Sequence, residues 1–160
     1  MANTHLIKTR VEPFVRDWLA EKYAQKFTKE FLSLSDCCGV HEFDAVSADK
    51  KIVCGIKSSS AATSGGKNPS GKIAGAYEEL YFLASVDANQ RLLVLTDEEF
   101  FRLLSKRMKG KLSREIKLLY CPLTPELAQL VGAIQSDARD EIDRGKPQLN
   151  VREHRDNLPG

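Results

Sequence analysis

The chain has 160 residues, of which 42% are hydrophobic and 29% charged, and a formal net charge of +2. This length fits one domain with a sizeable core, and the small net charge excludes no class of partner. No apolar run is long enough to span a bilayer, and the start MANTHLIKTR lacks the apolar stretch of a secretory signal. We therefore expect a cytoplasmic domain over residues 1–145, a polar tail over 146–160, and no membrane partner.

The cysteines give no sign of a zinc site. They form no CxxC pair and no Cys/His group with zinc-finger spacing. Cys37 and Cys38 are adjacent, so on a strand they would point to opposite faces and make poor joint ligands. We expect buried, reduced thiols.

The first predicted element is a helix over residues 10–32. Its apolar residues recur at helical spacing: Val11, Phe14, Val15, Trp18, Phe27 and Phe31. Pro13 suits a first helical turn, where its missing N–H is not needed. This places Glu12 at the helix N-terminus.

A β-hairpin is predicted over residues 39–58, with its turn at Ala48-Asp49, because polar and apolar residues alternate on either side. A Ser/Gly-rich loop follows over residues 59–71, and a helix over 72–86. A short apolar strand, 91–96, ends at Thr96, which we expect to cap a helix running through Met108. A strand over 116–120 and a last helix from 124–126 to about Arg144 complete the chain.

This order predicts an α/β fold. An antiparallel hairpin that leads into β-α-β units implies a mixed central sheet with helices on both faces.

The hairpin carries the residues of greatest chemical interest. Glu42 and Asp44 share one face of its first strand, and Gly55 and Lys57 share one face of the second. If Asp44 pairs with Val53 and Glu42 with Gly55, both carboxylates and Lys57 lie on one face of the sheet. A slip of one residue would send Lys57 to the opposite face.

Such a cluster has the parts needed for phosphodiester hydrolysis. Two carboxylates can hold Mg²⁺ through oxygen ligands. The metal polarises a phosphoryl oxygen and activates a water, and a lysine can orient that water and stabilise developing charge.

Asp44, followed by a strand that ends in Gly55-Ile56-Lys57, resembles the motif of the PD-(D/E)XK nuclease superfamily. That motif is a metal-binding Asp and then, on the next strand, an acid, any residue and a lysine. The resemblance covers roughly residues 10–96 and implies a restriction endonuclease-like α-β-β-β-α-β core, here with an extra C-terminal strand and helix. It implies Asp44 as metal ligand and Lys57 as catalytic lysine. Glu12 matches a first-helix glutamate that some members place near the metal, although an acid at a helix N-terminus is also favourable against the helix dipole.

Gly55 departs from the motif, because glycine has no side chain to bind a metal. Glu42 could fill the vacated space, or Glu78 or Glu79 could supply the acid from the following helix, as in some restriction enzymes that resemble this pattern. The third reading is a site without catalysis, which leaves a binding module.

The segment beyond Lys57 is a candidate contact for nucleic acid. From Lys50 to Tyr77 the sequence has lysines and no acidic residue, and such stretches can neutralise phosphates. The candidate contacts are Ser58, Ser59, Lys67 and Lys72. The alternative is a flexible connector.

We therefore expect a Mg²⁺-dependent endonuclease that acts on DNA, with Asp44, Glu42 and Glu12 as metal ligands, Lys57 beside the attacking water, and Glu79 or Glu78 as a third acid. The alternative is an inactive member of the same fold that binds nucleic acid or a protein. A homodimer is left open.

Overall fold

A mixed five-stranded sheet forms the centre of the protein, which the computed structural model describes over residues 4–62, 66 and 68–144. The strands lie side by side in chain order. β1, β2 and β3 are antiparallel neighbours, whereas β3–β4 and β4–β5 are parallel. The strands are β1 (Phe27–Ser33), β2 (Val40–Ser47), β3 (Ile52–Lys57), β4 (Gln90–Leu95) and β5 (Ile116–Tyr120). The predicted α/β class with a mixed sheet is confirmed.

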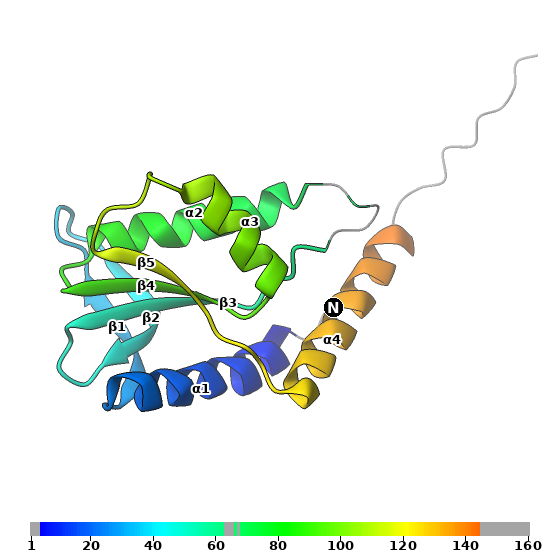
Figure 1. Ribbon diagram of the computed structural model, residues 1–160, viewed down its shortest axis with the longest axis horizontal. Helices are drawn as coiled ribbons and strands as arrows, with labels where there is room; N and C mark the ends of the chain where they lie inside the picture. The colour runs from blue at the N-terminus through cyan, green and yellow to red at the C-terminus, as the bar shows by residue number, and fades with distance from the viewer. Residues whose placement is uncertain (1–3, 63–65, 67, 145–160) are drawn as a thin grey trace, which may run out of the picture.

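Helices cover both faces of this sheet (Figure 1). They are α1 (Thr4–Tyr23), α2 (Ser70–Ser85), α3 (Glu98–Met108) and α4 (Pro125–Arg144). α1 lies against one face, and α2 and α3 lie against the other (Figure 1). The chain therefore runs helix, three strands, helix, strand, helix, strand, helix. No helix in the described part of the chain is both long and apolar enough to cross a membrane.

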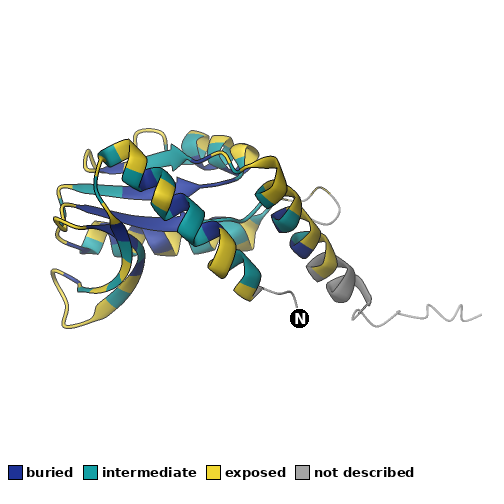
Figure 2. Cartoon of the chain, turned by 90° about the horizontal axis from the view of Figure 1, so that it is seen from below, coloured by how far each residue is buried: buried dark blue, intermediate teal, exposed yellow. Residues whose placement is uncertain are grey.

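The sheet divides the core into two layers, so every central strand is buried on both faces, as Figure 2 shows for the dark blue strands. Val53 and Leu93 pack toward α2 and α3, whereas Cys54 and Leu92 pack toward α1. This alternation follows from the twofold period of a strand. It also identifies which face each residue of β3 and β4 occupies.

The first predicted helix was wrong in both its bounds. α1 begins at Thr4 and ends at Tyr23, and Ala24 follows with φ of 53°. Phe27 and Phe31 belong to β1, where Phe27 is buried and Phe31 is 66% exposed. A spacing of four residues places two side chains on the same face of a helix, but it also places them on the same face of a strand. Glu12 is consequently in the middle of α1, and the helix-dipole explanation for it does not hold.

Two smaller expectations were also wrong. The strand ends at Leu95, and Asp97 rather than Thr96 caps α3: its side chain accepts a hydrogen bond from Phe100 N at 2.9 Å. Cys37 and Cys38 are exposed in the β1–β2 connection, while Cys54 and Cys121 are buried, and all four are free thiols. The predicted tail over 146–160 lies outside the described residues.

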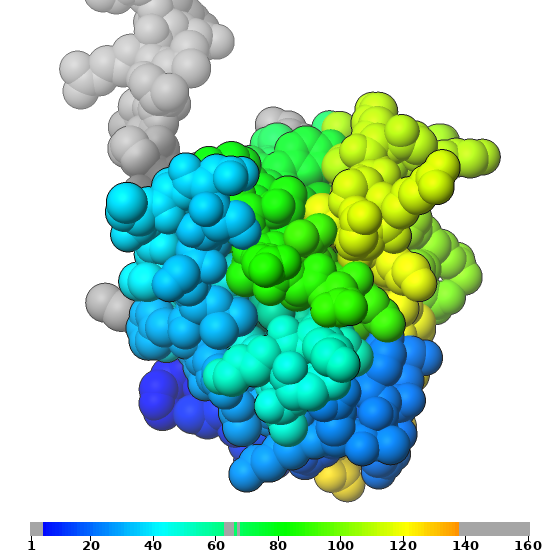
Figure 3. Space-filling view, turned by 90° about the vertical axis from the view of Figure 1, so that its left-hand side faces the viewer, coloured from blue at the N-terminus to red at the C-terminus, as the bar shows by residue number. Residues whose placement is uncertain are grey.

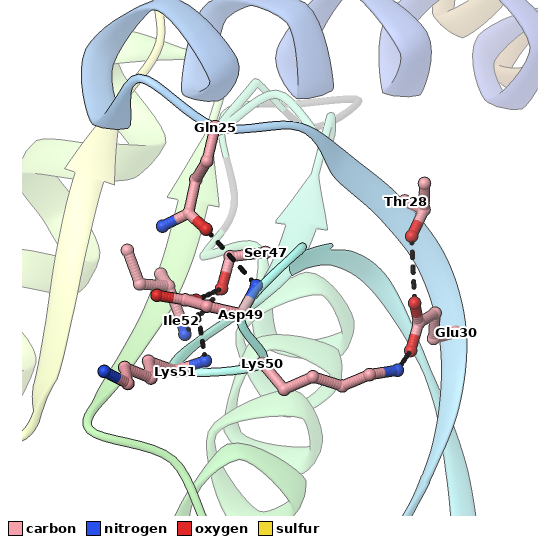
Figure 4. A network of polar contacts seen from close by, with 8 residues as sticks. All are labelled: Gln25, Thr28, Glu30, Ser47, Asp49, Lys50, Lys51 and Ile52. Atoms are coloured by element: carbon pink, nitrogen blue, oxygen red, sulfur yellow. Dashed lines mark hydrogen bonds and ion pairs between the residues drawn. The ribbon is translucent and has the colours of Figure 1, made fainter.

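The β2–β3 turn sets a register that differs from the predicted one. Val46 pairs with Val53 and Ala45 with Cys54, so each residue of β3 pairs two residues further along β2 than expected, where Val53 was paired with Asp44. Figure 4 shows how the turn is held: Ser47 Oγ donates to Asp49 Oδ1 at 2.7 Å, and Lys51 N donates to the same oxygen at 3.0 Å. Lys50, with φ of 61°, extends to an ion pair with Glu30. A shift of two residues preserves the face of each side chain.

A bulge in β2 does change the faces. Thr28 pairs with Val46 and Glu30 with Phe43, so three steps along β2 oppose two steps along β1. The extra residue lies at Asp44-Ala45. A bulge of this kind turns over the side chains that lie beyond it. Phe43 and Val46 therefore both pack toward α2, although they are an odd number of residues apart.

The β1–β2 connection, the β2–β3 turn and the segment between α2 and β4 lie together at one end of the sheet. In Figure 3 the β1–β2 connection is seen beside the end of α2 and the start of β4. Leu34 forms a bridge with Val86, and Gln90 N donates to Lys51 O at 3.0 Å. The parallel strands run away from this end, so Lys57 and Leu95 are at the opposite end of the molecule.

Candidate functional site

Gly55 and Glu79 share one space on the α2 side of the sheet. A Cβ atom added to Gly55 would lie 2.5 Å from Glu79 Cγ and 2.6 Å from its Oε1, well inside van der Waals contact. The carboxylate of Glu79 therefore occupies the volume that a side chain at position 55 would need. Glu79 is only 8% exposed, so it reaches this position as a buried residue of α2.

Two groups flank the carboxylate of Glu79. Lys57 Nζ lies 3.5 Å from its Oε2, and His41 Nε2 lies 3.5 Å from its Oε1. Lys57 comes from the end of β3, two residues beyond Gly55 and on the same face. His41 comes from β2. Three neighbouring elements thus converge on one acidic side chain.

The His41 contact is close without being a hydrogen bond. In the described part of the chain, His41 Nε2 and Glu79 Oε1 are both buried and neither has a hydrogen-bond partner. The His41 ring stacks on Phe82 with a centroid separation of 3.9 Å and meets the edge of Phe43 at 4.8 Å. Aromatic packing therefore fixes the imidazole independently of the carboxylate.

Two of the other predicted acids, Glu42 and Glu12, lie toward α1. Glu42 Oε1 lies 2.9 Å from Lys29 Nζ, and the same Nζ lies 3.9 Å from Glu12 Oε2. Arg16 also lies 3.7 Å from Glu12. Burial, and next the nearby carboxylate of Asp44, raise the pKa of Glu12, while the hydrogen bond with Glu42 raises the pKa of Lys29.

Asp44 sits at the bulge and is tied to β3. Its Oδ2 accepts a hydrogen bond from Ile56 N at 2.8 Å, and its backbone oxygen accepts one from Arg16 Nη1 at 2.9 Å. Ile56 is the residue between Gly55 and Lys57, so Asp44 is bound to the backbone that carries both. The side chain replaces a ladder hydrogen bond at the point where the regular pairing of β2 with β3 ends.

The expected single cluster of Glu42, Asp44 and Lys57 was therefore wrong. Among the described residues Lys57 forms its ion pair with Glu79, and neither Asp44 nor Glu42 pairs with it. The physical reason is the bulge: had β2 continued regularly past Ala45, Asp44 would have faced the same side as Gly55. Sequence alternation alone contains no sign of the extra residue.

The remaining predicted residues are spread around the end of β3. Glu78 is exposed on α2. Ser58 and Ser59 are half-buried, and the Ser58 carbonyl accepts a hydrogen bond from Gln135 at 2.9 Å. Lys72 Nζ donates to the backbone oxygens of Ser60 at 2.6 Å and Ala62 at 2.9 Å. Lys67 lies outside the described residues.

Sequence reasoning left three contributors without a role in the site. Lys29 and Arg16 hold the acids on the α1 side, and His41 approaches Glu79. Alternation along β2 places His41 on the face opposite Asp44, and the bulge makes that the face of Lys57. The alternation of His41 with Phe43 was the available signal for its position.

The donors suit a hard cation only in part. The described residues contain no group of three or more His, Cys, Asp or Glu side chains placed to share a metal ion. Mg²⁺, however, is commonly bound by one or two carboxylates together with waters and substrate phosphates. Glu79 Oε1 is a buried carboxylate oxygen without a hydrogen bond, and it fits such a donor.

Comparison of the chain with protein-family models, curated proteins and solved structures gave no match. The interpretation of the site therefore depends on its own geometry and on the motif.

Proposed function

We propose that this protein hydrolyses phosphodiester bonds in DNA with Mg²⁺, and that Glu79 supplies the acid that the PD-(D/E)XK motif has at position 55. One observation carries the proposal: the Glu79 carboxylate fills the space of the missing Gly55 side chain and lies beside Lys57. Of the three candidates for the missing acid, Glu42 pairs with Lys29 on the other side and Glu78 is exposed.

The chain order adds support. A helix, three antiparallel strands, a helix and a strand parallel to β3 follow one another, as the resemblance implies for a restriction endonuclease-like core. Asp44 lies on the middle strand of the three, and its hydrogen bond to Ile56 N holds it against the motif strand.

Each residue has a role in this proposal. Glu79 would hold Mg²⁺ beside Lys57, and when bound the metal polarises the phosphoryl oxygen and lowers the pKa of a bound water. Asp44 remains a predicted second ligand: it starts from the other face of β2, but its Oδ2 reaches the backbone of β3 at Ile56, between Gly55 and Lys57. Lys57 orients the attacking water and stabilises negative charge on the phosphoryl group. Glu12 and Glu42 keep Lys29 and Arg16 beside Asp44. Ser58, Ser59, Lys67 and Lys72 remain predicted contacts to the DNA backbone.

Cleavage of plasmid DNA with Mg²⁺ or Mn²⁺ tests the proposal. Glu79→Ala and Asp44→Ala should each lower the rate by roughly 100-fold or more, as for groups that stabilise charge in a transition state. Glu78→Ala, the exposed neighbour on the same helix, is the matched control and should cut like the wild type. Adding Gly55→Glu to Glu79→Ala returns a carboxylate to the same space from β3 and should restore part of the rate. A wild-type protein that cuts neither DNA nor RNA with either metal would refute the proposal.

The second candidate is a non-catalytic binding module of the same fold. It is favoured by the contacts of Glu79 with both Lys57 and His41 and by the lack of a three-donor group among the described residues. Mobility shift in EDTA discriminates the two: binding that survives EDTA and Asp44→Ala, without cleavage in metal, supports the module. A lack of salt-dependent affinity for nucleic acid would argue against the nuclease and against a nucleic-acid-binding module, and would leave a module that binds a protein. The homodimer stays a prediction.

A further inference from the structure

We propose that His41 is a positioning residue that holds the Glu79 carboxylate in the space left by Gly55 and thereby keeps Lys57 available for chemistry. This inference rests on the proposed function of Glu79 and Lys57. It assigns a role to the imidazole that the motif does not contain.

The geometry divides the two oxygens of Glu79 between two partners. Lys57 approaches Oε2 and His41 approaches Oε1, each at 3.5 Å. A carboxylate with a separate partner on each oxygen has little freedom to rotate about its last bond. Oε1 makes no hydrogen bond in the described part of the chain, so the imidazole 3.5 Å away is the polar neighbour that offsets its burial. Without His41 that compensation is lost, and an uncompensated buried carboxylate oxygen is costly. The carboxylate would then turn both oxygens toward Lys57 and leave the space beside Gly55.

The imidazole is suited to this role because it is itself held. It stacks nearly parallel on Phe82, with an interplanar angle of 11°, and Phe82 is in the same helix as Glu79. Phe43, two residues along β2, meets it edge-on. These contacts hold the ring in place before the carboxylate is engaged, and a group held in this way can orient the ligand that it touches.

Three substitutions separate positioning from packing. His41→Phe keeps a ring that can stack on Phe82 but has no Nε2. His41→Gln places an amide nitrogen near the position of Nε2, whereas His41→Asn is too short to reach Glu79. On plasmid cleavage we expect His41→Phe and His41→Asn to lower kcat by about 10–100-fold, the usual effect of losing a group that orients a ligand, with KM and DNA affinity in EDTA unchanged. His41→Gln should recover most of the rate.

A second readout does not need activity. The urea midpoint of His41→Phe is compared with that of the wild type, and again in the Glu79→Ala background. If the imidazole holds the carboxylate, the loss in midpoint should be clearly larger when Glu79 is present.

The outcomes are distinct. If His41→Phe cleaves like the wild type, or if Gln and Asn at position 41 are equally active, the imidazole only packs and the inference is overturned. If His41→Phe does not fold, the comparison of Gln with Asn carries the kinetic test. If the wild type cleaves nothing, the proposed function fails, and the urea comparison still decides whether His41 positions Glu79, because equal losses in both backgrounds would refute it.

Discussion

Gly55→Ala offers the sharpest test of the space shared by Gly55 and Glu79. The added Cβ would lie 2.5 Å from Glu79 Cγ, 2.8 Å from its Cδ and 2.6 Å from its Oε1. Restoring an ordinary contact of 3.4 Å requires a shift of about 0.9 Å. A flexible, exposed side chain could make that shift freely, but Glu79 is buried between Lys57 and His41. The carboxylate must therefore leave its position or strain α2 against the sheet.

The expected magnitude combines two opposing terms. Overpacking a buried site costs about 1–3 kcal/mol, and replacing glycine by alanine in a strand returns roughly 0.5–1 kcal/mol. We expect a net loss of about 0.5–2 kcal/mol in the free energy of unfolding, measured by urea denaturation followed by circular dichroism. In the Glu79→Ala background the clashing atoms are gone, so Gly55→Ala should be neutral or stabilising there.

Gly75→Ala is the matched control. Gly75 lies in α2, and a Cβ added there meets no atom within 4 Å. It should stabilise the protein by about 0.5–1 kcal/mol, the difference between glycine and alanine in a helix. The reasoning is refuted if Gly55→Ala is as stable as the wild type, or if it costs the same with and without Glu79.

Three further predictions concern residues away from this pair. Ala24 ends α1 with φ of 53°, so Ala24→Gly should remove a strain of about 1 kcal/mol and raise the melting temperature by about 3 °C; an unchanged value would contradict it. Asp97→Ala removes the acceptor for both Phe100 N and Ala61 N and should cost about 1–2 kcal/mol in thermal or urea unfolding. Burial and Asp44 raise the pKa of Glu12 above its usual 4.5, so the folded protein binds this proton more tightly than the unfolded chain, and Glu12 contributes less stability as pH rises through its folded pKa. The urea midpoint of Glu12→Gln should therefore rise relative to that of the wild type as the pH is raised from below 4.5 through the folded pKa of Glu12, and parallel curves would refute the expected shift.

Much of the fold could be predicted because its core strands are strongly apolar. The last four residues of β4 are a continuous apolar run and β3 is apolar up to Lys57, and both strands were found within a residue or two of their bounds. β1 was missed because its sequence, FTKEFLS, is half-exposed and its two phenylalanines are four residues apart. A lone edge strand has no buried partner on one side, so the apolar alternation that identifies strands is weak there. The segment forms a strand because it pairs with β2, and the residues of β1 alone do not reveal that pairing.

The bulge is the part of the site that no local pattern could reveal. Alternation correctly placed Glu42 with Asp44 and Gly55 with Lys57, because each pair lies within one regular stretch. Whether the two pairs lie on the same face depends on how β2 pairs with β3. One extra residue at Asp44-Ala45 then reversed the relation between them. A prediction that places residues of several strands on one face fails if the register between any two of those strands differs from the expected one.

The choice between Glu78 and Glu79, by contrast, was within reach of the sequence. A stripe drawn through all the apolar residues on one side of α2 includes Tyr77 and Ala84, which are both exposed. The stripe that is buried consists of Ile73, Ala76, Leu80 and Leu83. At 3.6 residues per turn Glu79 lies about 80° from the centre of that narrower stripe and Glu78 about 180° from it. Only Glu79 can therefore turn in toward the sheet, and a glycine facing it is what allows an acid to be buried there. Gly55 and Glu79 are in this sense one feature: the strand lacks a side chain where the helix supplies one.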